Sequence, residues 1–371
     1  MKKTMIALAT IAAVGSASAQ VTLGGEFAWG WAAFSKNGTE TSGGGMDTSQ
    51  VAFKANEDLG NGMSIAYKAT VNLAEYGGTV NADDQSLTLT TPMGALSLLS
   101  FKPGNWVMGA SGSSTWYGLD GKNLGARASR DGYSLTIPVA TGLTVTAAFT
   151  EPAGSTAWAA GNAGVSGTAT PTGSVYQGIY NFGAKYSAGP AVLQAAFLTY
   201  SNVGTTDATT DTVTRLGGTY DLGVAKVGAA IQMGKAAGGG TDNETAISVT
   251  APLAANLTVA GLYGIRDTKV SDTSFLAGAT GTRNGYSIEA KYNMSKTTYV
   301  ILGYGAWTGQ TVTPASATSY AIAQKAVAAK PATGQLACAA GDICATPAAA
   351  QSIVNHTKDS SFTHLTLVKD F

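Results

Sequence analysis

Alternation of apolar and polar residues, repeated between turn-forming sequences, is the feature of this sequence that most limits its fold. MSIAYKATVNL, residues 63–73, places Ile65 and Tyr67 on one face of an extended chain and Lys68 and Thr70 on the other. A period of two residues is typical of a β-strand whose two faces meet different environments. None of the periodic segments has helical spacing, so the sequence predicts an all-β fold.

Sixteen segments of this kind follow one another along the chain, which gives an even number of predicted strands. The predicted strands span residues 21–34, 48–57, 63–75, 84–91, 95–101, 126–138, 142–151, 176–187, 190–200, 212–222, 224–235, 244–251, 256–267, 284–294, 297–307 and 360–371.

The links between the predicted strands differ at the two ends of the molecule. Links after even-numbered strands are short, such as DLGNG and TPMG, whereas those after odd-numbered strands include SKNGTETSGGG and residues 102–125, 152–175 and 308–359. This asymmetry is typical of bacterial outer-membrane barrels, and a soluble sandwich does not need it. We therefore predict a sixteen-stranded antiparallel transmembrane β-barrel with short periplasmic turns and long extracellular loops.

The final segment, THLTLVKDF, carries the alternation through Lys369 to Phe371. A sheet in lipid must close without an edge, because lipid offers no hydrogen-bond partners to an unpaired strand. We therefore expect this segment to pair antiparallel with VTLGGEFAWG, which follows residue 20. Phe371 would then lie at the periplasmic interface. Three tyrosines are expected to join it in an aromatic girdle: Tyr186, Tyr220 and Tyr292.

The first 19 residues predict a secretory signal peptide, and the barrel is expected to span residues 20–371 in the outer membrane of a Gram-negative cell. Lys2 and Lys3 precede an apolar stretch that ends near Val14, and small residues lead up to Ala19. No later run of residues is long and apolar enough to predict a membrane-spanning helix. The formal net charge is zero, so no nucleic-acid partner is expected.

The cysteines and histidines predict a disulfide and neither a metal site nor another cofactor. Cys338 and Cys344, in CAAGDIC, are the only cysteines, and in an exported protein this spacing favours a small disulfide loop. Together with His356 and His364 they lack the ligand spacing of a metal site. A Ser-His hydrolase would need a histidine beside a nucleophile, and no catalytic motif stands out, so the sequence predicts no enzyme.

Three stretches, VTLGGEFAWG, SQVAFKANEDLGNGMSIAYK and the terminal LTLVKDF, resemble the general diffusion porins of Gram-negative bacteria, specifically the betaproteobacterial and neisserial branch. The resemblance implies a sixteen-stranded barrel, usually a homotrimer, whose third long loop folds into the pore and narrows it. It also implies that the outer-membrane assembly machinery reads Phe371 as a signal. Two features depart from the family pattern. Gly24 or Gly25 replaces an expected tyrosine, and the expected constriction loop, residues 102–125, contains one acidic residue, Asp120.

The phase of the alternation predicts the pore lining, because the faces opposite the lipid-facing side chains would meet water. That phase assigns more basic than acidic residues to the lumen, and rings of Arg or Lys favour anions. A bulge would reverse the phase of its strand. The alternative is that each basic residue is a solvated wall charge without a special role. The predicted pore-lining residues are Lys54, Lys68, Arg130, Lys185, Arg215, Lys226, Arg266, Lys291, Glu26, Glu244, Glu289, Asp370 and, in the loop, Asp120.

Two features leave alternatives open. Trp106 and Trp116, in the expected constriction loop, could stack on a solute or anchor the loop to the wall. The strand over residues 95–101 is apolar on both faces, as expected if a neighbouring subunit covers it outside and the loop covers it inside. A tightly packed, glycine-poor segment beneath a loop would have the same pattern. The sequence predicts passive diffusion of small hydrophilic solutes and ions. The alternative function is a plugged barrel that acts as an adhesion or ligand-binding surface protein through residues 308–359.

Overall fold

The computed structural model describes residues 20–36, 39–73, 80–125, 128–152, 178–201, 210–269, 281–309 and 359–371. The predicted signal peptide, the cysteines Cys338 and Cys344, and His356 lie outside the described residues.

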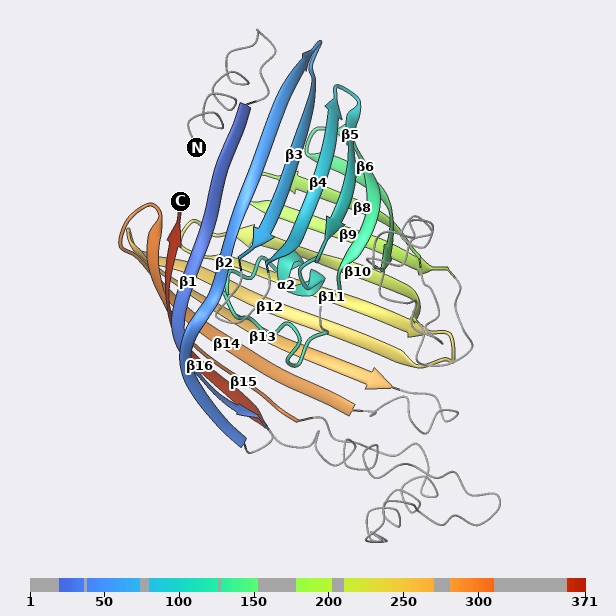
Figure 1. Cartoon of the computed structure of the whole chain (residues 1–371). Coiled ribbons are helices and arrows are strands. Elements are labelled where there is room, and N and C mark those ends of the chain that lie inside the picture. The colour runs from blue at the N-terminus through green and yellow to red at the C-terminus, as the bar shows by residue number, and fades with distance from the viewer. Residues whose placement is uncertain are drawn as a thin grey trace, which may run out of the picture.

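Sixteen antiparallel strands form one closed barrel, as the sequence predicted (Figure 1). Each strand pairs with its neighbours in sequence, and β1 pairs with β16 from Glu26 opposite Asp370 to Ser35 opposite Ser361. The strands are β1 (Gln20–Lys36), β2 (Thr39–Gly60), β3 (Met63–Asn72), β4 (Asn81–Thr91), β5 (Gly94–Phe101), β6 (Arg130–Ala140), β7 (Leu143–Pro152), β8 (Ile179–Ala188), β9 (Ala191–Tyr200), β10 (Thr210–Asp221), β11 (Lys226–Ala236), β12 (Thr241–Ala254), β13 (Leu257–Lys269), β14 (Gly281–Asn293), β15 (Thr298–Trp307) and β16 (Ser360–Asp370).

The prediction that SKNGTETSGGG forms a long loop is wrong, because most of these residues belong to β1 and β2. Pairing of these strands continues as far as Lys36 opposite Thr39. One glycine of β2 lies against a large side chain of β1. A Cβ atom at Gly44 would lie 3.2 Å from the ring of Trp29, so glycine leaves room for the indole. The link after β11 is also short, and it is closed by a 2.8 Å bond from Ala236 N–H to the Gly240 carbonyl.

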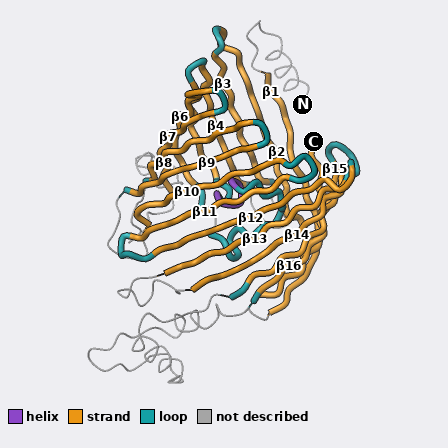
Figure 2. Tube along the Cα trace, turned by 180° about the vertical axis from the view of Figure 1, so that it is seen from behind, coloured by secondary structure: helices purple, strands orange, loops and turns teal. Residues whose placement is uncertain are grey.

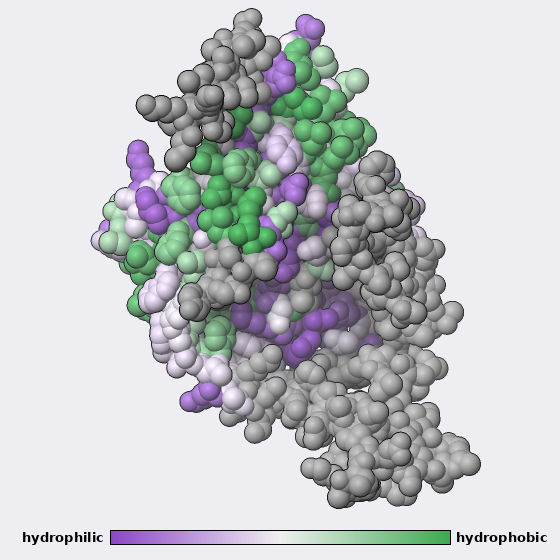
Figure 3. Space-filling model, viewed as in Figure 1, coloured by the Kyte–Doolittle hydropathy of each residue, from purple (hydrophilic) through white to green (hydrophobic). Residues whose placement is uncertain are grey.

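The outer face of the barrel is apolar. In the space-filling view, hydrophobic residues cover the outside over β3–β5, and hydrophilic residues line the hollow at the centre (Figure 3). Tyr186, Tyr220 and Tyr292 are 45–49% exposed on the outer face, at the end of the barrel with the short turns. We call this end the turn end and the opposite one the loop end. Among the described residues, no helix is long and apolar enough to cross a membrane.

The seam between β1 and the end of the chain contains a fitted pair, Gly25 and Phe371. Gly25 N–H donates to the Phe371 carbonyl at 2.9 Å, and Phe371 N–H donates to the Gly25 carbonyl at 3.1 Å. A Cβ atom at Gly25 would collide with the Phe371 ring. Glycine therefore stands here because the terminal ring lies across its backbone, an arrangement in which an aromatic side chain covers a strand glycine.

Candidate functional site

Residues 102–125 leave the loop end of β5, enter the barrel and lie against its inner wall; this segment is called the inner loop. Its short helix α2 (Trp106–Ala110) is drawn inside the ring of strands in Figure 1. The Asn105 side chain caps this helix by accepting the backbone N–H of Met108 at 3.2 Å. The same side chain donates to the carbonyl of Gly125 at 3.2 Å, so the two ends of the inner loop lie side by side.

An apolar contact fixes the inner loop to the wall formed by β11, β12 and β13. Small wall residues leave room for the loop, and a Cβ atom at Gly264 would lie 2.9 Å from the Leu119 side chain. Loss of this buried cluster would expose apolar surface to the water in the lumen. Its members are Val107, Ala110, Leu119 and Leu124 from the loop and Ala230, Ala246 and Leu262 from the wall, all 4% exposed or less.

Two buried carboxylates hold the inner loop at two points along its length. Glu244 of β12 accepts the backbone N–H of Gly125 at 2.6 Å and the side-chain amide of Asn105 at 3.3 Å. Glu289 of β14 accepts the backbone N–H groups of Trp116 and Tyr117, the latter at 3.0 Å. These bonds satisfy loop donors that have no partner within secondary structure. The loop is therefore fixed both at its ends and near its middle.

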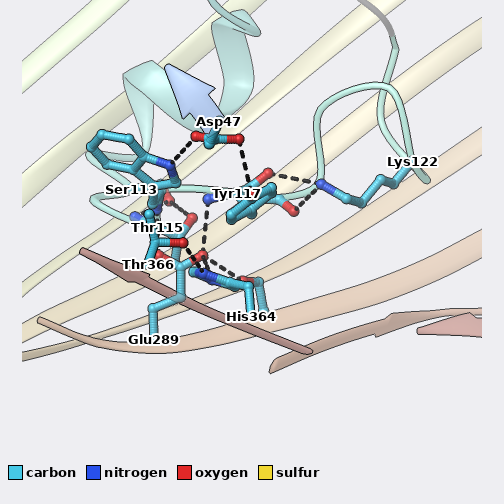
Figure 4. A network of polar contacts seen from close by, with 11 residues as sticks. Asp47, Ser113, Thr115, Tyr117, Lys122, Glu289, His364 and Thr366 are labelled. Atoms are coloured by element: carbon cyan, nitrogen blue, oxygen red, sulfur yellow. Dashed lines mark hydrogen bonds and ion pairs between the residues drawn. The ribbon is translucent and has the colours of Figure 1, made fainter. Parts of the chain in front are cut away.

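A bulge in β2 supplies a third attachment. The pairing of β1 with β2 shifts by one residue next to Asp47, and such a bulge redirects a side chain. Asp47 accepts hydrogen bonds from the Trp116 indole at 3.1 Å and from the Tyr117 hydroxyl at 2.8 Å. Figure 4 shows Asp47 on one side of Tyr117 and Glu289 on the other. The attachments extend from β2 to β14, which brackets the β1–β16 seam.

His364 lies beneath this part of the loop and is fully buried. Its Nε2 is 3.6 Å from an oxygen of Glu289, and its ring centre is 4.2 Å from that of Tyr117. Its Nδ1 lies 3.3 Å from the hydroxyl of Thr366 (Figure 4). The histidine that sequence reasoning considered for catalysis therefore forms part of the packing under the inner loop.

The contact between Tyr117 and Asp47 has a predictable pH range. Burial, followed by the hydrogen bond to Asp47, raises the pKa of the Tyr117 hydroxyl. A raised pKa means that this contact stabilises the fold fully below the ordinary tyrosine value of about 10 and loses its effect as pH rises beyond it. Replacing Tyr117 with Phe should lower thermal stability by roughly 1 kcal/mol at pH 7.

The matched measurement is the melting temperature of both proteins at pH 7, 9 and 11. The difference between Tyr117→Phe and the parent should be equal at pH 7 and 9 and smaller at pH 11. A difference that already disappears at pH 9 would contradict the assigned hydrogen bond.

Half of the predicted basic pore residues lie on β10, β11, β13 and β14, on the side of the barrel that carries the inner loop. Arg215 bonds Gln232 at 2.7 Å and lies 5.5 Å from the centre of the Trp106 ring. Arg266 makes two 2.7 Å bonds to Asp242. The other two are Lys226, whose Cε would lie 3.5 Å from a Cβ atom at Gly112, and Lys291, whose amine lies 3.5 Å from the centre of the Tyr299 ring.

The remaining predicted basic residues lie on the other side of the lumen. Lys54 of β2 stands directly opposite Lys68 of β3 in the strand register, and both side chains are exposed. Lys185 of β8 is also exposed and alternates with outward-facing Phe182 and Tyr186. Arg130, at the start of β6, is half-buried.

The predicted acidic residues divide between the wall and the loop. Glu26 and Asp370 are paired across the seam and are half-buried, and Glu244 and Glu289 are the carboxylates that hold the inner loop. Asp120 is half-buried in the loop itself.

Three charged residues of the inner wall are missing from the predicted pore lining, because the predicted strands began too late. Arg283 stands opposite Arg266 on the inner face, and the corresponding strand was predicted from residue 284. Asp242 precedes the strand predicted from residue 244, and Asp47 precedes the strand predicted from residue 48. The alternation extends back through Arg283 and Asp242, so a longer strand would have found them. Nothing in the sequence marked the bulge beside Asp47.

Both tryptophans of the inner loop contact the wall. Trp106 packs against the apolar cluster and Arg215. Trp116 meets the Tyr299 ring edge-on, with ring centres 6.2 Å apart, and donates to Asp47. These contacts favour anchoring over solute stacking.

Comparisons with known proteins place this geometry in context. A family model described as Gram-negative porin matches residues 4–310. The structure is similar to an anion-selective porin from Comamonas acidovorans, with 17% identity, a TM-score of 0.62 and coverage of 95% of this chain and 100% of the other. It is also similar to in-vitro folded OmpT, an outer-membrane protein of Vibrio cholerae in its trimer form, with 15% identity, a TM-score of 0.61 and coverage of 95% and 99%. A search of curated proteins finds no match.

Proposed function

The chain belongs to the Gram-negative porin family, whose members are outer-membrane diffusion channels, and we propose that small hydrophilic solutes and ions cross this barrel passively, with a mild preference for anions. The observation that carries the proposal is the one-sided position of the inner loop. The loop packs on β11–β13, while the inward-facing side chains of Lys54, Lys68 and Lys185 remain exposed to water. A water-filled passage along these lysines accounts for both facts.

The plugged-barrel alternative has less support, because the inner loop leaves these inward-facing lysines exposed. Swelling of proteoliposomes in isotonic sugar solutions tests the choice. Sugars should enter at rates that fall steeply as their size increases, because a water-filled passage excludes solutes by diameter. Liposomes that hold folded barrel yet swell no faster than empty liposomes would contradict the proposed diffusion.

The pair formed by Lys54 and Lys68 is proposed to set the anion preference. Replacing both with Glu changes the local charge from two positive to two negative, and each unit charge acts on a passing ion with about 1 kcal/mol at 4 Å in water. The reversal potential in a salt gradient should therefore change from the anion-selective to the cation-selective sign. The effect should weaken in 1 M salt, where the Debye length falls to about 3 Å.

Lys296→Glu is the matched control, because Lys296 lies in a turn at the turn end and is exposed outside the lumen. It carries the same change of charge per residue and should leave the reversal potential nearly unchanged. An unaltered potential in the Lys54→Glu/Lys68→Glu protein would contradict the assigned role of the pair.

A homotrimer is the proposed assembly, with β5 among the contacting strands. Leu96 and Leu98 face outward and are 43% and 49% exposed. The trimeric neighbour from Vibrio cholerae supports this proposal as a similar fold. The proposed partners are outer-membrane lipid and, for insertion, the assembly machinery acting on Phe371.

A further inference from the structure

The outer wall on the far side from β1–β5 contains an apolar trough that the channel function does not use. It consists of two adjoining hollows of about 530 Å³ and 560 Å³, and both are lined by Ala184, Ala195 and Leu216. Figure 2 shows the strands that carry it, β6 to β12, from behind. Ile231 and Ala229 of β11 line one hollow, and Phe182 and Phe197 line the other.

Side-chain size explains the trough. Ala184 stands opposite Ala195 in the pairing of β8 with β9. The next outward-facing pair on one side is Phe182 with Phe197, and on the other side it is Tyr186 with Leu193. Two methyl groups therefore lie between two rows of large side chains. In a membrane, a recess of this composition is filled by hydrocarbon, because exposing its apolar surface to water would be unfavourable.

Two lysines lie on the same outer face at the loop end of the trough. Lys235 shares its face of β11 with Met233 and with Ile231, which lines the trough. Thr241 of β12 pairs with Lys235 on one side and with Lys269 of β13 on the other. The two lysine positions are therefore two strand spacings apart, about 10 Å. Both side chains are exposed.

Polar residues surround the two lysines, so the apolar band of the outer wall ends here, on the side of the loop end. Asp267 lies on the same face, two residues from Lys269 toward the turn end. Its carboxylate accepts a hydrogen bond from the Thr282 hydroxyl at 2.8 Å. One acid thus stands beside two bases, and the row keeps a net positive charge. Lys235 lies about 13 Å along the strand from Ile231, because the chain rises about 3.3 Å per residue.

From this arrangement we propose that the outer wall over β8–β13 binds a phosphate-bearing lipid of the outer leaflet. Its acyl chains lie in the trough over Ala184 and Ala195. Its phosphate groups lie against Lys235 and Lys269, with the Thr241 hydroxyl between them. The loop end of a porin faces the cell exterior, so the lipid comes from the outer leaflet. Positive residues at a membrane surface attract anionic headgroups, which supplies the charge complementarity.

Native mass spectrometry of the detergent-purified full chain tests this site, with diphosphoryl lipid A and its dephosphorylated form as probes. The parent protein should retain the phosphorylated lipid roughly thirtyfold better, as expected for two lysines near a headgroup that contribute about 1 kcal/mol each. The Lys235→Ala/Lys269→Ala protein should bind both forms equally. Lys296→Ala, which removes a lysine at the opposite end of the barrel, should behave as the parent.

A second variant tests the trough independently of charge. Ala195→Phe fills the floor of the trough. It should weaken the binding of both lipid forms by a similar factor, and the preference for the phosphorylated form should remain. Unchanged single-channel conductance verifies that each variant is folded. The proposal is overturned if the double lysine variant keeps the phosphate preference, or if folded Ala195→Phe binds both lipids as well as the parent.

Discussion

Deleting Phe371 is expected to reduce the yield of membrane-inserted barrel at least about tenfold, because the deletion removes two ladder hydrogen bonds, each contributing about 1 kcal/mol, from the seam that closes the sheet. Both bonds join Phe371 to Gly25. The loss falls on the pairing of β16 with β1, and an unpaired edge in lipid is costly. The yield is measured in cells as the heat-modifiable, folded fraction in the outer membrane.

Two substitutions test whether the contact between Gly25 and Phe371 accounts for the loss of yield. Gly25→Leu should lower the yield as well, because its side chain occupies the position of the Phe371 ring. Lys369→Ala is the control. Lys369 also faces outward on β16, but its amine donates to the Thr297 hydroxyl at 2.6 Å and takes no part in the pairing of Phe371 with Gly25. Normal yield from the Phe371 deletion would mean that closure does not depend on the fitted pair.

Removing the tip of the inner loop is expected to raise single-channel conductance at least about twofold, because pore diameter controls ion flow and the loop fills one side of the lumen. Residues 106–124 would be replaced by two glycines. The hydrogen bond from Asn105 to Gly125 shows that the ends to be joined are already neighbours. The barrel strands themselves stay intact.

Glu289→Gln supplies the milder comparison. The glutamine keeps one carbonyl oxygen, which can accept one of the two backbone N–H groups of Trp116 and Tyr117, and it loses the second carboxylate oxygen. The inner loop should therefore become more mobile while it remains inside the barrel. We expect increased noise in the open-channel current and little change in its mean. Equal mean conductance in the parent and the loop-deleted protein would show that the inner loop does not narrow the passage.

The fold was predictable from the sequence because one physical constraint governs the whole wall. The strands separate an apolar outside from a wetter inside, so most of them show alternation that marks their extent; the strand over residues 95–101, apolar on both faces, is an exception. The prediction was wrong where small residues broke the pattern. Gly43, Gly44 and Gly45 resemble a loop sequence, although all three belong to β2 and Gly44 leaves room for the Trp29 ring.

The candidate site was less predictable, because its geometry depends on contacts far apart in the sequence. Phase alone placed Glu244 and Glu289 among the pore charges, but it could not reveal that both hold the inner loop. Asp47 depends on a bulge, which leaves no compositional mark in this segment. The fitting of Phe371 over Gly25 is also invisible in either segment alone, although the replacement of an expected tyrosine by glycine pointed to the position.

Single-channel recording in a planar lipid bilayer tests the central claim, a water-filled passage beside a wall-bound inner loop, most directly. Purified, folded protein should produce discrete, stable conductance steps that scale with bulk salt conductivity. Large neutral polymers that cannot enter should leave the steps unchanged, and small ones that enter should reduce them. Folded barrels that insert into the bilayer without producing any steps would contradict the account.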